Sequence, residues 1–473
     1  MEDKAAFQRY ASPNEQRTIS REDLGFYHGV VIGAVYEFEN SFDVTSPQSF
    51  FAPLQRCIKE HPFLTVTVAD RHTDKAFYER VPSIDLKNHL TVLDKSTDVN
   101  KWQAIEAVLR FNLDRPFTHE VPPWRVVVLP LTLGSSCFIA FIYSHTILDG
   151  PSGVAFHRTF RTAAGSTTKQ SIPTSIITTP STPLPPPFDT PDRLPISWLF
   201  LLGPLLAVLM PQFLANWLGL KPQASTVDQG TWTGDSCAFD PATTRTKLVL
   251  REIPPPLLEK ALRTSKEHGA RLTGTLHILV TRALSKALVD KPEFTNFASQ
   301  TPINMRRAAG VPPDEMGEFA SGVYEMHPRI STDVCSSSLT DEEWAAARFC
   351  SEKLADAASR LQDQPIGLLR YVPSIRKWTV AKLGRQRDSS YELSNVGVFD
   401  NGGREGVKIR EMVFAQPGMA VGSPLCVNVV SAKGGSLVYT MTWVTGALGV
   451  PESEEDQFVE RVCQSIWEDF QRF

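Results

Sequence analysis

The residues best suited to chemistry are a histidine and an aspartate four positions apart, His145 and Asp149, followed directly by Gly150. They come after the apolar run 137–144, which is typical of a strand buried on both faces. His145 is therefore expected where that strand ends, a common place for reactive groups in α/β folds. An imidazole titrates near neutral pH and can take a proton from a hydroxyl that attacks a carbonyl. The pattern predicts a general base at His145, with Asp149 supporting its loop and Gly150 permitting a tight backbone path.

The alternative interpretation of this pattern is a core histidine beside a turn-capping aspartate. The strand end and the glycine favour the catalytic interpretation. Other familiar sites are missing from the sequence, which holds no G-x-S-x-G, H-E-x-x-H, phosphate loop or G-x-G-x-x-G. Their absence argues against the usual serine hydrolases, zinc proteases, nucleotide triphosphatases and dinucleotide enzymes. No metal site is expected.

Composition narrows the class of protein further. The chain has 473 residues, 42% of them hydrophobic, so it can bury a large core. Its 48 Lys and Arg against 52 Asp and Glu give a net charge of −4, which argues against a nucleic-acid partner. The seven cysteines are scattered, without a Cys-x-x-Cys pair, as suits a reducing compartment. The first residues contain no apolar run, so we expect no secretory signal and a cytoplasmic location.

The elements that would position His145 form a mixed α/β pattern on both sides of an unusual middle segment. We divide the chain into a lobe at 1–164 carrying the histidine motif, a middle segment at 165–235, and a second lobe at 236–473. The Val- and Ile-rich runs predict strands at 29–38, 63–68, 124–131, 137–144, 247–252, 297–303, 425–430 and 437–443. Helical periodicity predicts helices at 49–61, 102–111, 255–267, 272–288 and 455–470. The last two strands, separated by a Lys-Gly-Gly turn, predict a hairpin.

The middle segment has two parts with different compositions. Residues 165–195 are rich in Pro, Ser and Thr, and we expect them to be a mobile surface segment without a packed core. Residues 194–220 contain no charged side chain, and prolines interrupt them. We expect broken helices there, either packed on the protein or lying peripherally at a membrane or lipid-droplet surface.

Residues 145–150 resemble the H-x-x-x-D-G signature of the CoA-dependent acyltransferase superfamily, which includes chloramphenicol acetyltransferase, plant BAHD enzymes and peptide-synthetase condensation domains. Further segments resemble this superfamily in the same order along the chain. They are Glu60 to Leu64, Phe111 to Asp114, Pro123 to Arg125, Pro302 to Arg307 with Pro312, Pro313 and Gly317, and Ser394 to Gly397. The residues Leu24 to His28 make the fungal and yeast alcohol O-acetyltransferases the closest resemblance.

The resemblance implies two chloramphenicol-acetyltransferase-like lobes with mixed sheets and a tunnel between them, with His145 midway along it. It implies acetyl-CoA, or another acyl-CoA, as a co-substrate with no bound cofactor. The acceptor would be a small hydrophobic alcohol such as a secondary metabolite, and transfer would be direct, without an acyl-enzyme. In such relatives the motif aspartate pairs with an arginine, for which Arg56, Arg125 and Arg306 are candidates. We expect a monomer.

The resemblance also suggests substrate-binding residues in the second half of the chain. Gly150, Ser394, Asn395 and Gly397 are candidates for lining the acceptor site, with Ser394 and Asn395 able to donate to an oxyanion or, alternatively, to cap a strand end. Arg306 and Lys433 are candidates for contacts with the CoA phosphates.

Two departures from the superfamily pattern affect these expectations. Condensation domains usually carry a doubled histidine, and Ser144 stands at the first of these two positions, which favours a hydroxyl acceptor over peptide-bond formation. Glu318 follows Gly317 where many relatives have Asn. Two other hypotheses remain: amide formation or use of a carrier-bound acyl group, and a non-catalytic protein that binds a ligand or partner on this fold.

Overall fold

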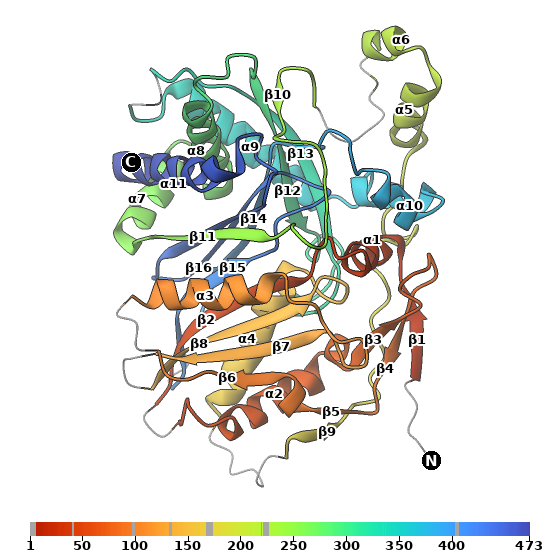
Figure 1. Ribbon diagram of the computed structural model, residues 1–473, viewed down its shortest axis with the longest axis vertical. Coiled ribbons are helices and arrows are strands. Elements are labelled where there is room, and N and C mark those ends of the chain that lie inside the picture. The colour runs from red at the N-terminus through yellow and green to blue at the C-terminus, as the bar shows by residue number, and fades with distance from the viewer. Residues whose placement is uncertain are drawn as a thin grey trace.

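The computed structural model describes residues 6–39, 42–96, 100–131, 135–166, 174–218, 220, 227–333, 335, 337–402 and 406–473. The fold is mixed α/β, as predicted, and consists of two lobes built on separate large sheets (Figure 1). The predicted helices and strands are present, most within three residues of the expected bounds.

The first lobe centres on a five-stranded sheet in which the strand before His145 is the middle strand. The sheet has the order β15-β2-β8-β7-β6. Its strands are β15 (Lys408–Ala415), β2 (Gly29–Glu37), β8 (Ser136–Ser144), β7 (Trp124–Pro130) and β6 (Leu90–Val92). Every residue of β8 after the first is buried, because helices cover both faces of the sheet. One face packs against α2 (Gln48–Glu60) and α4 (Gly150–Ala164), and the other against α3 (Lys101–Leu113).

The second lobe is built on a seven-stranded mixed sheet. Its strands run in the order β10-β12-β14-β16-β17-β11, with β13 paired to β12. They are β10 (Thr231–Trp232), β11 (Thr246–Ile253), β12 (Asn296–Asn304), β13 (Ala320–Pro328), β14 (Tyr391–Phe399), β16 (Leu425–Ala432) and β17 (Leu437–Val444). The predicted hairpin is confirmed, because β16 and β17 pair antiparallel. The helices of this lobe are α7 (Pro255–Glu267), α8 (Leu272–Ala287), α9 (Asp341–Ser359) and α11 (Glu455–Arg472).

In two places, a strand from one of the three sequence segments defined above joins the sheet of another segment. Strand β15 lies in the last third of the chain but pairs along its length with β2 of the first lobe. Strand β10, in the middle segment, pairs with β12 of the second lobe. The C-terminal half therefore contributes directly to the sheet that carries His145.

The edge of the first lobe holds smaller elements that approach the site. A three-stranded sheet consists of β1 (Ala6–Tyr10), β4 (Phe77–Arg80) and β3 (Val66–Ala69), and a two-stranded ribbon of β5 (Ser83–Asp85) and β9 (Ile176–Thr178). Helix α1 (Pro13–Asp23) begins at a capping box, in which Ser12 and Glu15 satisfy each other's backbone amides. It packs on α10 (Ile375–Val380) of the second lobe, as Figure 1 shows.

The expectation that residues 165–195 contain no packed core is wrong for their second part; residues 167–173 lie outside the described residues. Phe188 and Leu194 are buried in a small cluster with Ile303, Met305 and Phe319. The carboxylate of Asp189 accepts a hydrogen bond from the backbone amide of Asn14 at 2.9 Å. A few apolar anchors between prolines are enough to fix this segment along the protein surface, although its composition resembles that of a linker.

The uncharged stretch 194–220 forms two short helices, α5 (Trp198–Leu209) and α6 (Gln212–Trp217). No described side chain of α5 is buried, so this helix is not packed in the core. None of the helices in the described part of the chain is both long and apolar enough to cross a bilayer.

Candidate active site

The loop after β8 is held in a tight turn that presents His145. The backbone amide of Ile147 donates to the carbonyl of Ser144, which closes the turn at 3.3 Å. The hydroxyl of Tyr78 donates to the carbonyl of Thr146 at 2.7 Å, so a strand of the neighbouring sheet supports the loop from outside. His145 is left partly accessible, with 22% of its side chain exposed, between buried neighbours on both sides.

Asp149 ends this loop and joins the two lobes. It is the N-cap of α4, where its carboxylate accepts from the amide of Ser152 at 3.1 Å and from the Ser152 hydroxyl at 2.7 Å. The same carboxylate forms a two-pronged pair with Arg306, with both N–H···O distances at 2.8 Å. It also accepts from the amide of Phe319 at 3.0 Å. Burial would raise the pKa of Asp149, but the Arg306 charge and these hydrogen bonds lower it below the usual value.

Among the three arginines considered as the partner of Asp149, the structure places Arg306 against it. Arg125 donates to backbone carbonyls instead, and Arg56 pairs with Glu60. Each guanidinium nitrogen of Arg306 already has a protein partner, and the residue is only 1% exposed. This geometry gives no support to the expected contact of Arg306 with CoA, because its N–H groups are engaged within the protein.

Gly150 occupies a point where the two lobes approach closely. A β-carbon placed there would lie 2.7 Å from the Cγ1 atom of Val396, on β14 of the second lobe. A larger residue at position 150 would therefore require the Val396 side chain or its surroundings to shift. The glycine is thus explained by close approach between segments and not by an unusual backbone angle.

Glu318 is the direct partner of His145. The Nδ1 atom of His145 lies 2.7 Å from Oε1 of Glu318, whose side chain is only 3% exposed. Burial lowers the pKa of the imidazole, but the negative charge and hydrogen bond of Glu318 outweigh it, so the net pKa is raised. Burial also raises the pKa of Glu318, and the attraction of His145 offsets only part of that rise.

This contact determines which nitrogen of His145 can react. With Nδ1–H donating to the Glu318 carboxylate, the neutral ring keeps its lone pair on Nε2. No described residue hydrogen-bonds Nε2 of His145. The carboxylate therefore orients the ring and stabilises the imidazolium that forms when Nε2 accepts a proton. The sequence indicates that Glu318 differs from the residue of many relatives, but it does not predict the contact of Glu318 with His145.

The other candidate residues in the second half are less directly connected to His145. The amide of Asn395 donates to Thr273 at 3.1 Å and its oxygen accepts from the backbone of Gly397 at 2.9 Å, which caps the strand bend. Ser394 is buried on β14, and Gly397 is exposed with a φ of +91°. No contact of Ser394, Asn395 or Gly397 with His145 is found within the described ranges. Lys433 is exposed and pairs with Asp400 at 2.8 Å.

A buried polar network lies on the other side of the histidine. The ring of Tyr27 is 5.8 Å from that of His145, and its hydroxyl donates to Gln416 at 2.7 Å. The amide of Gln416 in turn donates to Glu392 and Asn428, each at 2.7 Å. Tyr27 comes from the start of the chain and the other three residues from 392–428, and no local pattern in the sequence indicates that they meet.

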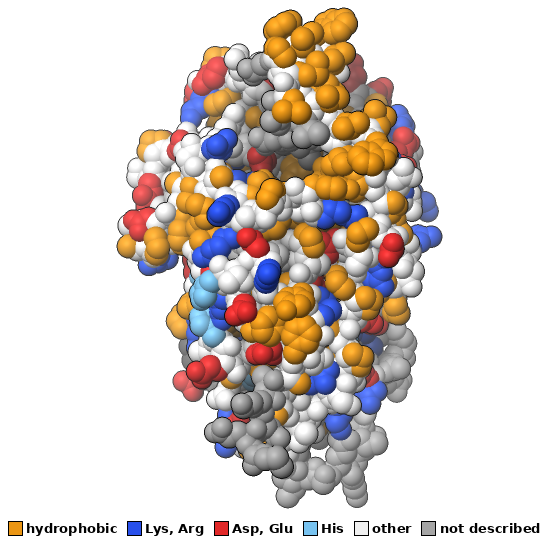
Figure 2. Space-filling model, turned by 90° about the vertical axis from the view of Figure 1, so that its right-hand side faces the viewer, with side chains coloured by type: hydrophobic (Ala, Val, Ile, Leu, Met, Phe, Trp, Pro, Cys, Tyr) orange, Lys and Arg blue, Asp and Glu red, His pale blue; other side chains and the backbone are white. Residues whose placement is uncertain are grey.

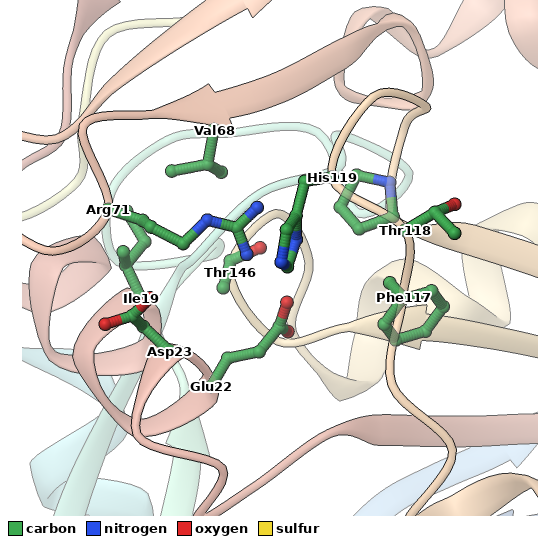
Figure 3. Close-up of a pocket in the computed structure, with 10 residues that line it drawn as sticks. Ile19, Glu22, Asp23, Val68, Arg71, Phe117, Thr118, His119 and Thr146 are labelled. Atoms are coloured by element: carbon green, nitrogen blue, oxygen red, sulfur yellow. The ribbon is translucent and has the colours of Figure 1, made fainter.

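A small pocket lies beside the loop and is lined in part by Thr146, which directly follows the histidine (Figure 3). Glu22, Arg71 and His119 face one another across it. The carboxyl group of Glu22 also hydrogen-bonds the Ser144 hydroxyl. Burial raises the pKa of Glu22 to about 7, so this group titrates near neutral pH.

The fold is shared with solved two-lobed acyltransferases and condensation domains. The trichothecene 15-O-acetyltransferase TRI3 of Fusarium sporotrichioides superposes with a TM-score of 0.65 at 12% identity, covering 98% of each chain. The starter condensation domain of rhizomide synthetase RzmA, solved with C8-CoA and Leu-SNAC, superposes with a TM-score of 0.57 at 14% identity, covering 99% of this chain and 94% of that one. These likenesses establish the two-lobed acyltransferase and condensation-domain fold.

Sequence comparison narrows this class to one family. Residues 93–465 match the alcohol acetyltransferase family. A relative named probable alcohol acetyltransferase crmB, from Aspergillus fumigatus, is 23% identical, with 97% of this chain and 98% of the relative aligned. The chain belongs to the alcohol acetyltransferase family and is an acyltransferase.

Proposed function

We propose that this acyltransferase transfers an acetyl group from acetyl-CoA to the hydroxyl of a small hydrophobic molecule, with His145 as the general base. The observation that carries the proposal is the pairing of His145 Nδ1 with buried Glu318, which leaves Nε2 free in a partly accessible ring. A base with this orientation needs only a substrate hydroxyl within hydrogen-bond reach of Nε2.

The reaction then needs no covalent enzyme intermediate. Nε2 of His145 takes the proton of the acceptor hydroxyl as its oxygen attacks the thioester carbonyl carbon. The resulting tetrahedral intermediate collapses, the C–S bond breaks, and the thiolate of CoA leaves. The imidazolium returns its proton to that sulfur, so the products are an ester and free CoA. Glu318 stabilises the positive charge on the ring between the two proton transfers.

Asp149 has a different role in this proposal. Its carboxylate is bonded to Arg306, Ser152 and the amide of Phe319, and it makes no contact with the His145 ring within the described residues. The pair fixes the start of α4 to the segment that carries Glu318, because Phe319 and Glu318 are adjacent in the chain. Asp149 is thus a positioning residue, and Glu318 carries the charge that the chemistry uses.

The nature of the substrates is supported by family and relatives. The family is one of alcohol acetyltransferases, and the named activity of the Fusarium neighbour is transfer to a hydroxyl of a trichothecene. The condensation-domain neighbour was solved with an acyl-CoA. Ser144, which stands at the position of the first histidine of the doubled pair in condensation domains, also favours an alcohol acceptor over an amine.

The experiment is an assay of the purified full-length protein with acetyl-CoA and pooled hydrophobic alcohols. Free thiol is followed in time, and ester products are identified by mass. Parallel reactions contain matching amines, or an acyl group loaded on a carrier protein in place of acetyl-CoA. Ester formation from acetyl-CoA supports the proposal. Products only from amines or from the carrier would assign a condensation activity, and binding without turnover of any donor would assign a non-catalytic role.

A further inference from the structure

Helix α5 exposes apolar side chains that the rest of the protein does not cover. Trp198, Leu199 and Leu209 are 77%, 87% and 73% exposed. With about 100° of rotation per residue, these three and the exposed Leu202 and Leu206 fall on one arc of the helix of about 100°. The arc is a continuous apolar stripe, which is rare on the free surface of a protein.

The following helix extends this stripe. Phe213 and Trp217 of α6 are 72% and 80% exposed, and Leu218 follows them. Figure 1 shows α5 and α6 standing out from the second lobe, and Figure 2 shows their hydrophobic side chains gathered at one end of the molecule. Tryptophans stand at the start of α5 and the end of α6, and this side chain prefers the boundary between membrane and water.

The base of these helices is fixed to the second lobe. The amide and hydroxyl of Ser197, the N-cap of α5, both donate to Asp363, at 2.7 and 3.0 Å. Arg370 donates to the carbonyl of Leu194 at 2.8 Å. The start of α5 is therefore fixed next to Asp363 and Arg370, and Tyr371, Trp378 and Val380, which follow in the chain, are also exposed.

The neighbouring surface carries positive charge. Residues 370–387 contain six Lys or Arg, of which Arg387 is buried and Arg376 and Lys382 pair with carboxylates. Lys377 and Arg385 are exposed, and neither has a carboxylate partner among the described residues. Exposed cations next to an apolar stripe are complementary to a surface with acidic headgroups above a hydrocarbon layer.

We propose that α5, α6 and the exposed residues of 371–385 form a docking face for an anionic phospholipid bilayer. The short helices lie in the interface with their stripe among the acyl chains, and Lys377 and Arg385 contact the headgroups. Because no described helix can span a bilayer, the attachment is peripheral. The same region contacts the pocket side of the first lobe, since Arg376 of α10 pairs with Asp23, which lines the pocket.

Vesicle flotation tests this docking face directly and does not depend on the acyltransferase reaction. The full-length protein is mixed with phosphatidylcholine vesicles, with or without about a third phosphatidylserine. We expect binding to both, and tighter binding to the anionic vesicles. The variant Trp198→Ser/Trp217→Ser should lose binding to both by about tenfold or more. The variant Lys377→Glu/Arg385→Glu should lose the preference for phosphatidylserine.

Matched controls separate these effects from general changes of the surface. Phe111→Ser/Phe349→Ser removes two aromatic side chains that are also exposed, on α3 and α9. Lys260→Glu/Arg263→Glu makes the same charge change on exposed positions of α7. Both should bind vesicles like the unchanged protein. The proposal is overturned if the unchanged protein floats with neither vesicle, or if the controls lose as much binding as the test variants. It is also overturned if light scattering shows a dimer that Trp198→Ser/Trp217→Ser converts to monomer, because a second copy would then cover the stripe.

Discussion

Replacing Glu318 by glutamine removes one negative charge next to His145 while keeping the size of the side chain. The contact at 2.7 Å is a charge-assisted hydrogen bond to a ring that becomes positive during the reaction. Hydrogen bonds to charged groups contribute about 1.5–3 kcal/mol, which corresponds to about a 10- to 150-fold change in rate. We expect Glu318→Gln to lower kcat by a factor in this range.

The pH dependence gives a second and more specific readout. The pKa of His145 is raised, with burial opposing and Glu318 supporting the charged ring, so activity should rise with pH through a value above the ordinary one for histidine. Without the negative charge of Glu318, less opposes the effect of burial on the imidazole, so the pKa of His145 falls. The acidic limb of the profile should therefore move to lower pH in Glu318→Gln, and the loss of rate should be largest on the alkaline plateau.

The assay follows thiol release from acetyl-CoA across the pH range at saturating alcohol. The control is Glu325→Gln, the same substitution at a buried glutamate of β13 that contacts Lys353 and not His145. Glu318 does not act as the charge partner of His145 if Glu318→Gln keeps a rate within about twofold of that control, or if it loses rate while the acidic limb stays at the same pH.

Two further predictions concern stability. Asp149→Ala leaves the buried Arg306 without its partner, so unfolding in urea should show a loss of about 3–5 kcal/mol, and an unchanged midpoint would contradict the structural role of Asp149. The pKa of Glu22 is about 7 in the folded protein, above the value of 4.5 expected in the unfolded chain. The folded state therefore binds this proton more tightly than the unfolded state does. As a result, the folded protein loses stability as the pH rises from about 4.5 to about 7. Glu22→Gln has no carboxyl group to titrate at this position, so the urea midpoint of the variant minus that of the unchanged protein should increase from about pH 5 to about pH 8. If this difference in midpoint stays constant, Glu22 does not titrate in this pH range.

The sequence predicts the part of the site that local patterns control. The apolar run 137–144 predicts a buried strand, and its end fixes where His145 stands, because a strand and the turn after it are determined mainly by neighbouring residues. The fold class follows from the same kind of pattern, and the resemblance in motif order agrees with the family match.

The partner of the histidine is not predictable in this way. Glu318 lies 173 positions after His145, and the two meet only because the second lobe packs against the start of α4. The choice of Arg306 over Arg56 and Arg125 depends on the same contact between lobes. Composition is also an incomplete guide, since the proline-rich segment contains the buried anchors Phe188 and Leu194.

The turnover of His145→Ala, measured with acetyl-CoA and an accepted alcohol, tests whether His145 is the general base. Nε2 of His145 is the proposed proton acceptor, and the ring is partly exposed, so the variant should fold with a urea midpoint close to that of the unchanged protein. Loss of a general base predicts a fall in kcat of roughly two to four orders of magnitude. Ester formation by folded His145→Ala at a rate close to that of the unchanged protein would show that His145 is not the general base.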